Sequence, residues 1–265
     1  MVKKALVLCG GGSKGAFEVG VLKILLQKWV PDVVIGTSVG AINGAVLLDG
    51  PNVYENIMRL ENIWLHTRRK DFFNFNKQLL YKLHLASSFY SNSNMIKFLR
   101  KWLVARKFED LSLPLYVNCT RLRDGHNIFF HSGSLIEPIV ASCTSPPLLP
   151  PFRIEDDYYF DGSLGSYIGI DLLKQNNYKK IVIINLINNH AIENSNNIID
   201  VSRHSLEIIK NSLIQREIEL CKGKEVATIS MHLNKNLHML DFSYTKELIK
   251  LGEEEAKKLL KREKL

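Results

Sequence analysis

The chain has 265 residues, of which 46% are hydrophobic and 23% are charged, and its formal net charge is +8 at pH 7. This length and balance fit one folded α/β domain over residues 1–265 and exclude an intrinsically disordered chain. The positive charge favours association with anionic surfaces, but we expect no nucleic-acid partner, and the oligomeric state is left open. No apolar run is long enough for a signal peptide or a bilayer span, so we expect a cytoplasmic protein with at most peripheral membrane contact.

The four cysteines are scattered along the chain, at Cys9, Cys119, Cys143 and Cys221. No two of them have the close spacing of a zinc site, and their number does not suit a disulfide framework in a chain of this length. We therefore expect reduced thiols and no metal.

The first fifty residues predict two β-turn-α units. An apolar run at 5–9 is typical of a strand, and apolar residues at helical spacing over 16–29 predict a helix. A second strand at 33–35 and a second helix at 39–48 follow, with a short glycine-bearing turn between them. Two such units in succession are typical of a parallel sheet that is covered by helices.

The next segment, at about 53–110, is rich in aromatic and basic residues and predicts a helical insertion beside the sheet. Within it, residues 71–90 carry aromatic side chains around lysines. A helix packed against the core is the favoured interpretation of this stretch, and a flap that rests on a membrane surface is the alternative.

The second half of the chain predicts further strands and helices. Ser134 and Glu137 have the spacing of a capping box, so we expect a helix to begin there, and the prolines at 146–151 exclude a regular helix. No internal repeat or linker divides the chain. The other expected elements are strands at 115–120, 127–131, 180–187 and 226–233, a hairpin at 152–160, and helices near 171, at 198–220 and at the C-terminus.

The strongest chemical signal is a GxSxG motif, GTSVG, that begins at Gly36, centres on Ser38 and ends at Gly40. It lies where the second strand turns into the second helix. A turn this sharp needs small neighbours and exposes the serine Oγ at the carboxyl edge of the sheet, near the positive end of the helix. Ser38 is therefore the predicted nucleophile, and a serine that only caps the helix is the alternative.

A glycine-rich segment, GGGSKG at 10–15, follows the first strand. It matches the GxGxxG pattern, which makes a dehydrogenase an alternative, but the acidic residue that would bind the ribose is missing from the end of the second strand. Three glycines at a helix N-terminus instead suit backbone amides that face a developing negative charge. We therefore predict an oxyanion hole from Gly10, Gly11 and Gly12, supported by Ser13, Lys14 and Gly15.

A serine nucleophile needs a base. The candidate histidines are His190, His204, His232 and His238, which all lie downstream of Ser38, and no motif surrounds any of them. Asp161 differs because it ends an apolar strand and is followed by Gly162 and Ser163. An aspartate that only stabilises a turn is the alternative explanation.

These motifs occur in an order that resembles patatin-like phospholipases: the glycine run, GTSVGAING at 36–44, the proline segment at 141–151 and the Asp-Gly pair at Asp161. The resemblance spans residues 4–187. It implies a three-layer α/β/α sandwich with a mostly parallel central sheet, similar to the catalytic domain of cytosolic phospholipase A2. It also implies a Ser-Asp dyad of Ser38 and Asp161, without histidine, metal or cofactor, that hydrolyses fatty-acyl esters of phospholipids or other lipids.

Two departures from the family pattern lie beside Asp161. Ser163 stands where the family usually has Gly or Ala, and Tyr167 and Gly169 stand where an Asn-x-Pro is common. The expected function is a phospholipase A-type acyl hydrolase. The departures support the alternative, a catalytically weak scaffold of this family that binds lipid or a protein partner.

Overall fold

The computed structural model describes residues 3–75, 88–187, 198–233 and 237–262. Part of the predicted 71–90 segment, His190 and the side chain of His204 lie outside the described residues. Among the described helices, none is both long and apolar enough to cross a lipid bilayer. All four cysteines are buried and unpaired.

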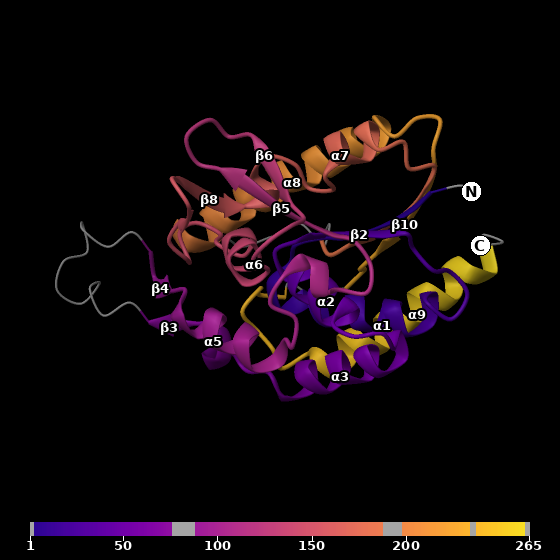
Figure 1. The fold of residues 1–265 in the computed structure, drawn as a ribbon, viewed down its shortest axis with the longest axis horizontal. Coiled ribbons are helices and arrows are strands. Elements are labelled where there is room, and N and C mark those ends of the chain that lie inside the picture. The colour runs from indigo at the N-terminus through magenta and orange to yellow at the C-terminus, as the bar shows by residue number, and fades with distance from the viewer. Residues whose placement is uncertain (1–2, 76–87, 188–197, 234–236, 263–265) are drawn as a thin grey trace.

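A mixed, mostly parallel sheet forms the centre of the molecule (Figure 1). In the described residues it has eight strands, in the order β10-β9-β1-β2-β5-β8-β7, with β6 paired to β5 beside this path. Strands β10, β9, β1, β2 and β5 run parallel, and β6, β7 and β8 pair antiparallel. The strands are β1 (Lys4–Leu8), β2 (Val33–Thr37), β5 (Leu115–Arg121), β6 (Asn127–Phe130), β7 (Phe152–Ile154), β8 (Asp157–Asp161), β9 (Lys180–Asn185) and β10 (Glu225–Ser230).

The central strand β1 is apolar along most of its length because its side chains enter two different hydrophobic cores. Leu6 and Leu8 belong to one core, and Ala5 and Val7 belong to the other. Successive side chains of a strand point to opposite faces, so a strand covered on both faces needs apolar residues at every position. Strands β2 and β9 alternate between the same two cores.

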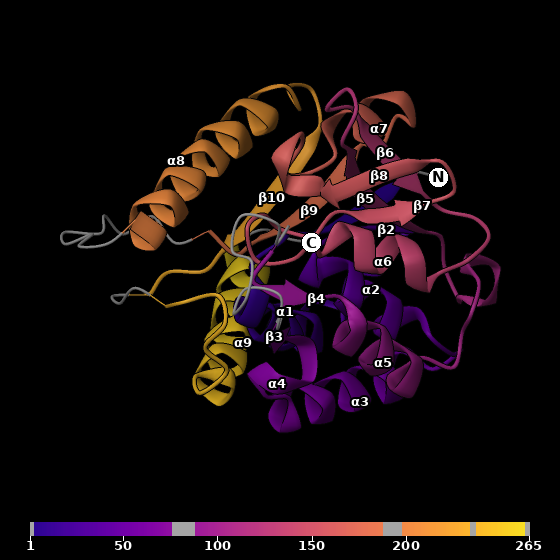
Figure 2. The same ribbon diagram turned by 90° about the vertical axis from the view of Figure 1, so that its left-hand side faces the viewer.

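Helices cover both faces of this sheet, as Figures 1 and 2 show. The helices α1 (Gly15–Leu25), α2 (Val39–Leu48), α3 (Val53–His66) and α9 (Thr245–Arg262) lie on one face, and α7 (Ile170–Gln175) and α8 (Ile198–Glu219) lie on the other. The expected three-layer α/β/α arrangement is therefore confirmed. The remaining elements are α4 (Arg69–Phe72), β3 (Asn74–Phe75), β4 (Tyr90–Ser91), α5 (Ser93–Trp102), α6 (Ile136–Ser142) and the 3₁₀ turns η1 (Gly12–Lys14), η4 (Phe108–Asp110) and η5 (Gly162–Leu164).

Most of the elements expected from the sequence are present, with differences at their ends. Helix α1 was expected to reach residue 29 but ends at Leu25, and the chain continues as a turn in which the Trp29 amide bonds to the Leu25 carbonyl. The prediction of a capping box before α6 is wrong, because the Ser134 hydroxyl contacts the Glu137 carboxylate and not a backbone amide. The segment at 53–110 contains helices, as expected, and also the small β3-β4 hairpin.

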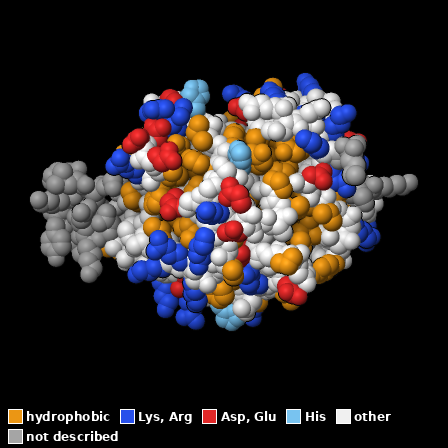
Figure 3. Space-filling model, viewed as in Figure 1, with side chains coloured by type: hydrophobic (Ala, Val, Ile, Leu, Met, Phe, Trp, Pro, Cys, Tyr) orange, Lys and Arg blue, Asp and Glu red, His pale blue; other side chains and the backbone are white. Residues whose placement is uncertain are grey.

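A cluster of basic side chains covers α5 and the loop that follows it. Figure 3 shows Lys and Arg side chains over the part of this face where Figure 1 labels α5. Such a cluster attracts anionic surfaces over a distance set by the ionic strength. The exposed cations of this segment are Lys97, Arg100, Lys101, Arg106 and Lys107.

Helix α2 begins in direct contact with the backbone of β1, and Gly40 makes this approach possible. A Cβ atom at Gly40 would lie 2.2 Å from the Leu8 carbonyl oxygen, a backbone atom that cannot move independently. At Gly44, four residues later, the nearest atom would be a Leu115 side-chain carbon at 3.0 Å. An added methyl group should therefore lower the stability of the fold more at Gly40 than at Gly44.

We expect Gly40→Ala to lower the free energy of unfolding by at least about 1 to 3 kcal/mol, the usual cost of overpacking. Gly44→Ala is the matched control, because a helical alanine gains up to about 1 kcal/mol over glycine and offsets a side-chain contact that can relax. Urea denaturation followed by circular dichroism measures both. Equal stabilities of the two variants would contradict the close approach of α2 to β1.

Candidate active site

Ser38 lies at the turn between β2 and α2, in a backbone conformation that serine rarely adopts. Its φ of 56° and ψ of −124° lie outside the regions that most L-residues occupy, and its side chain is nearly buried. The Ser38 amide donates to the Ser142 hydroxyl at 2.8 Å, and that hydroxyl donates to the Asn118 carbonyl oxygen at 2.6 Å. These bonds attach the strained turn to α6 and β5.

The glycines of the GxSxG motif leave room for this turn. A Cβ atom at Gly36 would lie 2.6 Å from the Ala41 Cα, so a side chain there would collide with the first turn of α2. With the Gly40 approach to β1, this explains why small residues flank Ser38. The structure therefore agrees with the turn expected at Ser38.

Asp161 ends β8, and its carboxylate is almost fully buried. Its Oδ1 accepts a hydrogen bond from the Ser163 amide at 2.9 Å, and its own amide donates to the Thr144 carbonyl oxygen at 2.9 Å. A Cβ atom at Gly162 would lie 2.3 Å from the Asn118 carbonyl oxygen, so the turn after Asp161 packs directly on β5. The hydroxyl of Ser163 is buried without a hydrogen-bond partner among the described residues.

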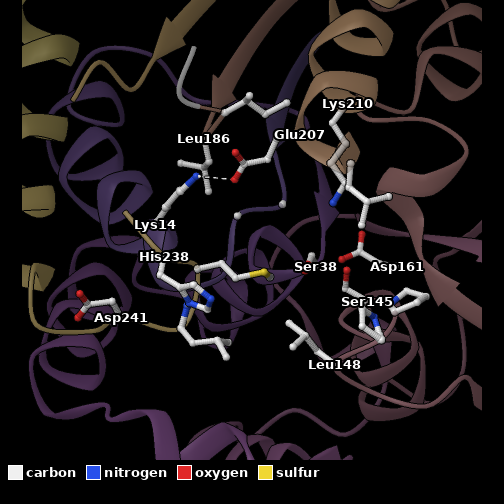
Figure 4. A pocket seen from close by; sticks show the side chains of 18 of the residues that line it. Lys14, Ser38, Ser145, Leu148, Asp161, Leu186, Glu207, Lys210, His238 and Asp241 are labelled. Atoms are coloured by element: carbon white, nitrogen blue, oxygen red, sulfur yellow. Dashed lines mark hydrogen bonds and ion pairs between the residues drawn. The ribbon is translucent and has the colours of Figure 1, made fainter. Parts of the chain in front are cut away.

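Ser38 and Asp161 line one pocket of about 810 Å³. Figure 4 shows their side chains next to each other, with His238 and Asp241 across the pocket. The Cys143 thiol is close to both: burial raises its pKa well above the ordinary value, the Asp161 charge raises the pKa further, and a hydrogen bond with Ser38 lowers it. No hydrogen bond joins the Ser38 and Asp161 side chains in this structure, and such contacts often tighten only when substrate binds.

The glycine loop after β1 passes beside Ser38. Gly10 and Gly11 line the same pocket, and a Cβ atom at Gly10 would lie 3.1 Å from the Ser38 Cβ. None of the N–H groups of Gly10, Gly11 and Gly12 donates to another residue that the structure describes. The loop therefore has backbone N–H groups that donate to no other described residue, and it lies next to the serine.

Gly12 turns the loop away from the pocket and is not among the residues that line it. Its φ of 60° lies in the left-handed region that favours glycine, and a Cβ atom there would lie 2.4 Å from the Met239 carbonyl oxygen. The Ser13 amide donates to that same oxygen at 2.8 Å, and the Ser13 hydroxyl donates to the His238 carbonyl oxygen at 3.2 Å. Segment 238–241, which also lines the pocket, is thereby attached to the loop.

The rest of the pocket is mainly apolar, with charged side chains on part of its lining. Lys14 is nearly buried and pairs with Glu207 at 3.7 Å. Arg69, Lys210 and Asp241 also lie on the lining. The apolar lining residues are Phe89, Tyr90, Pro146, Pro147, Leu148, Tyr167, Leu186, Ile187, Leu206, Met239 and Leu240.

Of the two candidate histidines whose side chains the structure describes, His238 lines the pocket and His232 does not. The Nδ1 atom of His238 accepts a hydrogen bond from the Leu240 amide at 3.1 Å, which uses that nitrogen within its own loop. Within the described ranges, no three His, Cys, Asp or Glu side chains come together in a way that would hold a metal ion.

A family model described as patatin-like phospholipase matches residues 6–174, the part of the chain that contains the glycine loop, Ser38 and Asp161. The chain belongs to the patatin-like phospholipase family. The solved structure of VipD from Legionella pneumophila is 14% identical, with a TM-score of 0.54 over 99% of this chain and 67% of that one, and it has the same fold.

Two curated relatives show how the chain relates to longer proteins. Lysophospholipase nte1 of Aspergillus terreus is 30% identical over 158 residues, which is 59% of this chain and 10% of that protein. Patatin-like phospholipase domain-containing protein 7 of Rattus norvegicus is 26% identical over 185 residues, which is 69% of this chain and 13% of that protein. The chain thus matches only about a tenth of the length of these relatives.

A buried polar network lies beneath the glycine loop of this patatin-like chain, and the sequence motifs did not reveal it. The Asn43 amide group donates to Glu18 Oε2 at 2.7 Å and to the Gly15 carbonyl oxygen at 3.0 Å, and it accepts from the Trp64 indole at 2.8 Å. Burial raises the pKa of Glu18 well above its ordinary value, while hydrogen bonds from Asn43 and the Cys9 backbone lower it. The network joins α1, α2 and α3 directly behind the loop.

We expect the stability difference between Glu18→Gln and the wild type to depend on pH. A carboxyl group with a raised pKa in the folded protein contributes stability below its ordinary pKa, and this contribution is lost as the pH rises through the folded value. Glutamine does not titrate, so the Tm of Glu18→Gln minus that of the wild type should increase as the pH rises above about 4.5. Thermal unfolding at a series of pH values, with Glu219→Gln as the exposed control, measures this. A difference that falls with rising pH would contradict the assignment.

Proposed function

We propose that this chain is a lipid acyl hydrolase of the phospholipase A type, a serine esterase that uses Ser38 and Asp161. The observation that carries the proposal is the meeting of three separate segments at one pocket: the strained serine turn, the buried carboxylate of β8 and the glycine loop. Membership of the patatin-like phospholipase family supports the same conclusion.

In the proposed reaction, the Ser38 hydroxyl attacks the carbonyl carbon of an ester while Asp161 accepts its proton. The amides of Gly10 and Gly11 stabilise the oxyanion of the tetrahedral intermediate. The intermediate collapses to an acyl-Ser38 ester, and the leaving alcohol takes the proton from Asp161. Water then attacks the acyl carbon while Asp161 takes its proton. The bond between Ser38 Oγ and the acyl carbon breaks, Ser38 takes the proton back from Asp161, and the fatty acid leaves. Because a carboxylate is a weak base, most of the rate must come from positioning and from the oxyanion donors.

The pocket supports a lipid substrate. Its volume of about 810 Å³ lies within the range of sites that enclose small-molecule ligands, and its lining is mainly apolar. Lys14, Arg69 and Lys210 on the lining suit a negatively charged headgroup such as a phosphate. The matched lysophospholipase supports a phospholipid or lysophospholipid as substrate, and the basic cluster at α5 supports peripheral contact with an anionic membrane surface.

We further propose that residues 1–265 act as one hydrolase unit, in which 53–110 is an insertion that completes the pocket. Helices α3 and α5 contribute Leu60 and Leu99 to the same hydrophobic core as the sheet. Arg69 and Tyr90 from the insertion lie on the pocket lining.

The alternatives lead to different experimental results. A catalytically weak scaffold would keep the pocket but would lack a reactive serine, and the departures at Ser163, Tyr167 and Gly169 are its support. A dehydrogenase is disfavoured because Met239 packs against Gly12 and Ser13, so the end of the glycine loop is covered where a dinucleotide phosphate would have to approach.

We expect wild-type protein to react with a fluorophosphonate probe and to hydrolyse lysophospholipid esters. Ser38→Ala and Asp161→Asn should each lower kcat by on the order of 10⁴-fold with little change in Tm, because each removes one member of a unit that acts together. Mass spectrometry of the released products measures the activity and the ester position. A folded wild type that neither reacts with the probe nor releases fatty acid would favour the scaffold.

Two pocket variants separate this dyad from other arrangements. Ser145→Ala removes another pocket serine and should leave probe labelling in place. His238→Gln should keep the shape of the pH-rate profile. Loss of a histidine-like ionisation in His238→Gln, with a fall in kcat similar to that of Ser38→Ala, would assign the base to His238 and not to Asp161.

A further inference from the structure

The side chain of Tyr167 bonds directly to the glycine loop. Its hydroxyl donates to the Gly10 carbonyl oxygen at 2.7 Å, across 157 positions of sequence. Tyr167 is the largest fully buried side chain of the described core, and burial raises its pKa well above the ordinary value, so the phenol keeps its proton. The residue that departs from the family pattern is therefore a fixed hydrogen-bond donor behind the loop.

This bond determines the direction of the next amide group. The Gly10–Gly11 peptide bond is trans, and the carbonyl and N–H of a trans peptide point in opposite directions within one plane. With the Gly10 oxygen held towards Tyr167, the Gly11 N–H points away from the tyrosine. Glycine has little conformational preference of its own, so a run of three glycines needs an external contact to hold one orientation.

Tyr167 is itself held rigidly from the other layer of the fold. Both carboxylate oxygens of Glu217, on α8, accept hydrogen bonds from the Tyr167 amide, at 3.0 and 3.2 Å, and one also accepts from the Ile168 amide at 2.9 Å. Glu217 is 3% exposed. On the other side, the Ser166 carbonyl oxygen accepts from Asn118 of β5 at 2.9 Å. The tyrosine thus links α8 and β5 to the loop beside Ser38.

We propose that Tyr167 is a positioning residue that aims the Gly11 amide at the reaction centre and so prepares the oxyanion hole. The inference rests on the proposed hydrolase function and assigns a role to a residue that differs from the family pattern. The Tyr167 hydroxyl acts through the Gly10 carbonyl, while the tyrosine ring is part of the pocket lining, a surface that Tyr167→Phe keeps. The contribution of the hydroxyl is made when negative charge develops on the substrate oxygen, and not when the substrate binds.

Tyr167→Phe tests this proposal because it removes one oxygen atom and keeps the ring. We expect kcat for a lysophospholipid ester to fall on the order of 10-fold and KM to stay within about twofold, less than the loss of a whole oxyanion donor. Tyr178→Phe is the matched control, since Tyr178 is a largely buried tyrosine of the same hydrophobic core that does not line the pocket. It should leave both constants within about twofold of wild type.

Two inhibitors separate a positioning role from general damage. A long-chain trifluoromethyl ketone forms an anionic adduct with an active serine, and its affinity should fall in Tyr167→Phe by the same factor as kcat/KM. A non-hydrolysable ether analogue of the substrate should keep its affinity, because it develops no oxyanion. Glu217→Gln is a second variant, which weakens the hold on Tyr167 without changing the tyrosine. It should also lower the affinity for the ketone and leave the affinity for the ether analogue unchanged.

The outcomes are distinct. Unequal weakening of the two inhibitors in Tyr167→Phe, with Tyr178→Phe unchanged, supports the positioning role. An active wild type whose Tyr167→Phe variant keeps kcat and ketone affinity within twofold overturns the inference and leaves the hydrolase proposal standing. Equal weakening of both inhibitors also overturns it. A wild type that hydrolyses no ester and does not react with a fluorophosphonate overturns the function, and the inference with it.

Discussion

The site depends on holding Ser38 in a backbone conformation that an isolated chain would avoid. Holding a non-glycine residue at such a positive φ lowers the stability of the fold by on the order of 1 to 3 kcal/mol, and contacts with the surrounding structure must offset this loss. Here the offset comes from the hydrogen bond of the Ser38 amide to Ser142, from the buried packing of α2 on β1, and from the small residues on both sides of the turn. The strain is stored where three segments meet.

Strand β5 gathers these segments, and Asn118 is its central residue. The Asn118 backbone carbonyl oxygen accepts a hydrogen bond from the Ser142 hydroxyl, which in turn accepts from the Ser38 amide. The Asn118 side-chain nitrogen Nδ2 donates to the Ser166 carbonyl oxygen, next to Tyr167. Gly162, directly after Asp161, packs on the same residue. One asparagine of β5 therefore contacts the segment that holds the serine turn, the turn after the carboxylate and the residue next to Tyr167.

The local elements were predictable because their signals are local. The apolar runs of β1 and β9, the glycine turns and the GxSxG motif are each contained within a few consecutive residues. A short apolar run bounded by turn residues is typical of a strand in a buried parallel sheet. The supporting contacts were not predictable, because Ser142, Asn118 and Glu217 are ordinary polar residues whose partners lie far along the chain. Tyr167 was visible only as a departure from the family pattern. The Ser134 capping box failed because the spacing alone does not decide whether a hydroxyl finds a backbone amide or a carboxylate.

A crystal structure of the covalent adduct between Ser38 and a long-chain fluorophosphonate tests the account most directly. The account predicts phosphorus bonded to Ser38 Oγ, one phosphoryl oxygen about 2.7 to 3.1 Å from the amide nitrogens of Gly10 and Gly11, and the alkyl chain in the apolar pocket. It also predicts the Tyr167 hydroxyl still bonded to the Gly10 carbonyl. An adduct on another residue, or a phosphoryl oxygen that points away from the glycine loop, would contradict it.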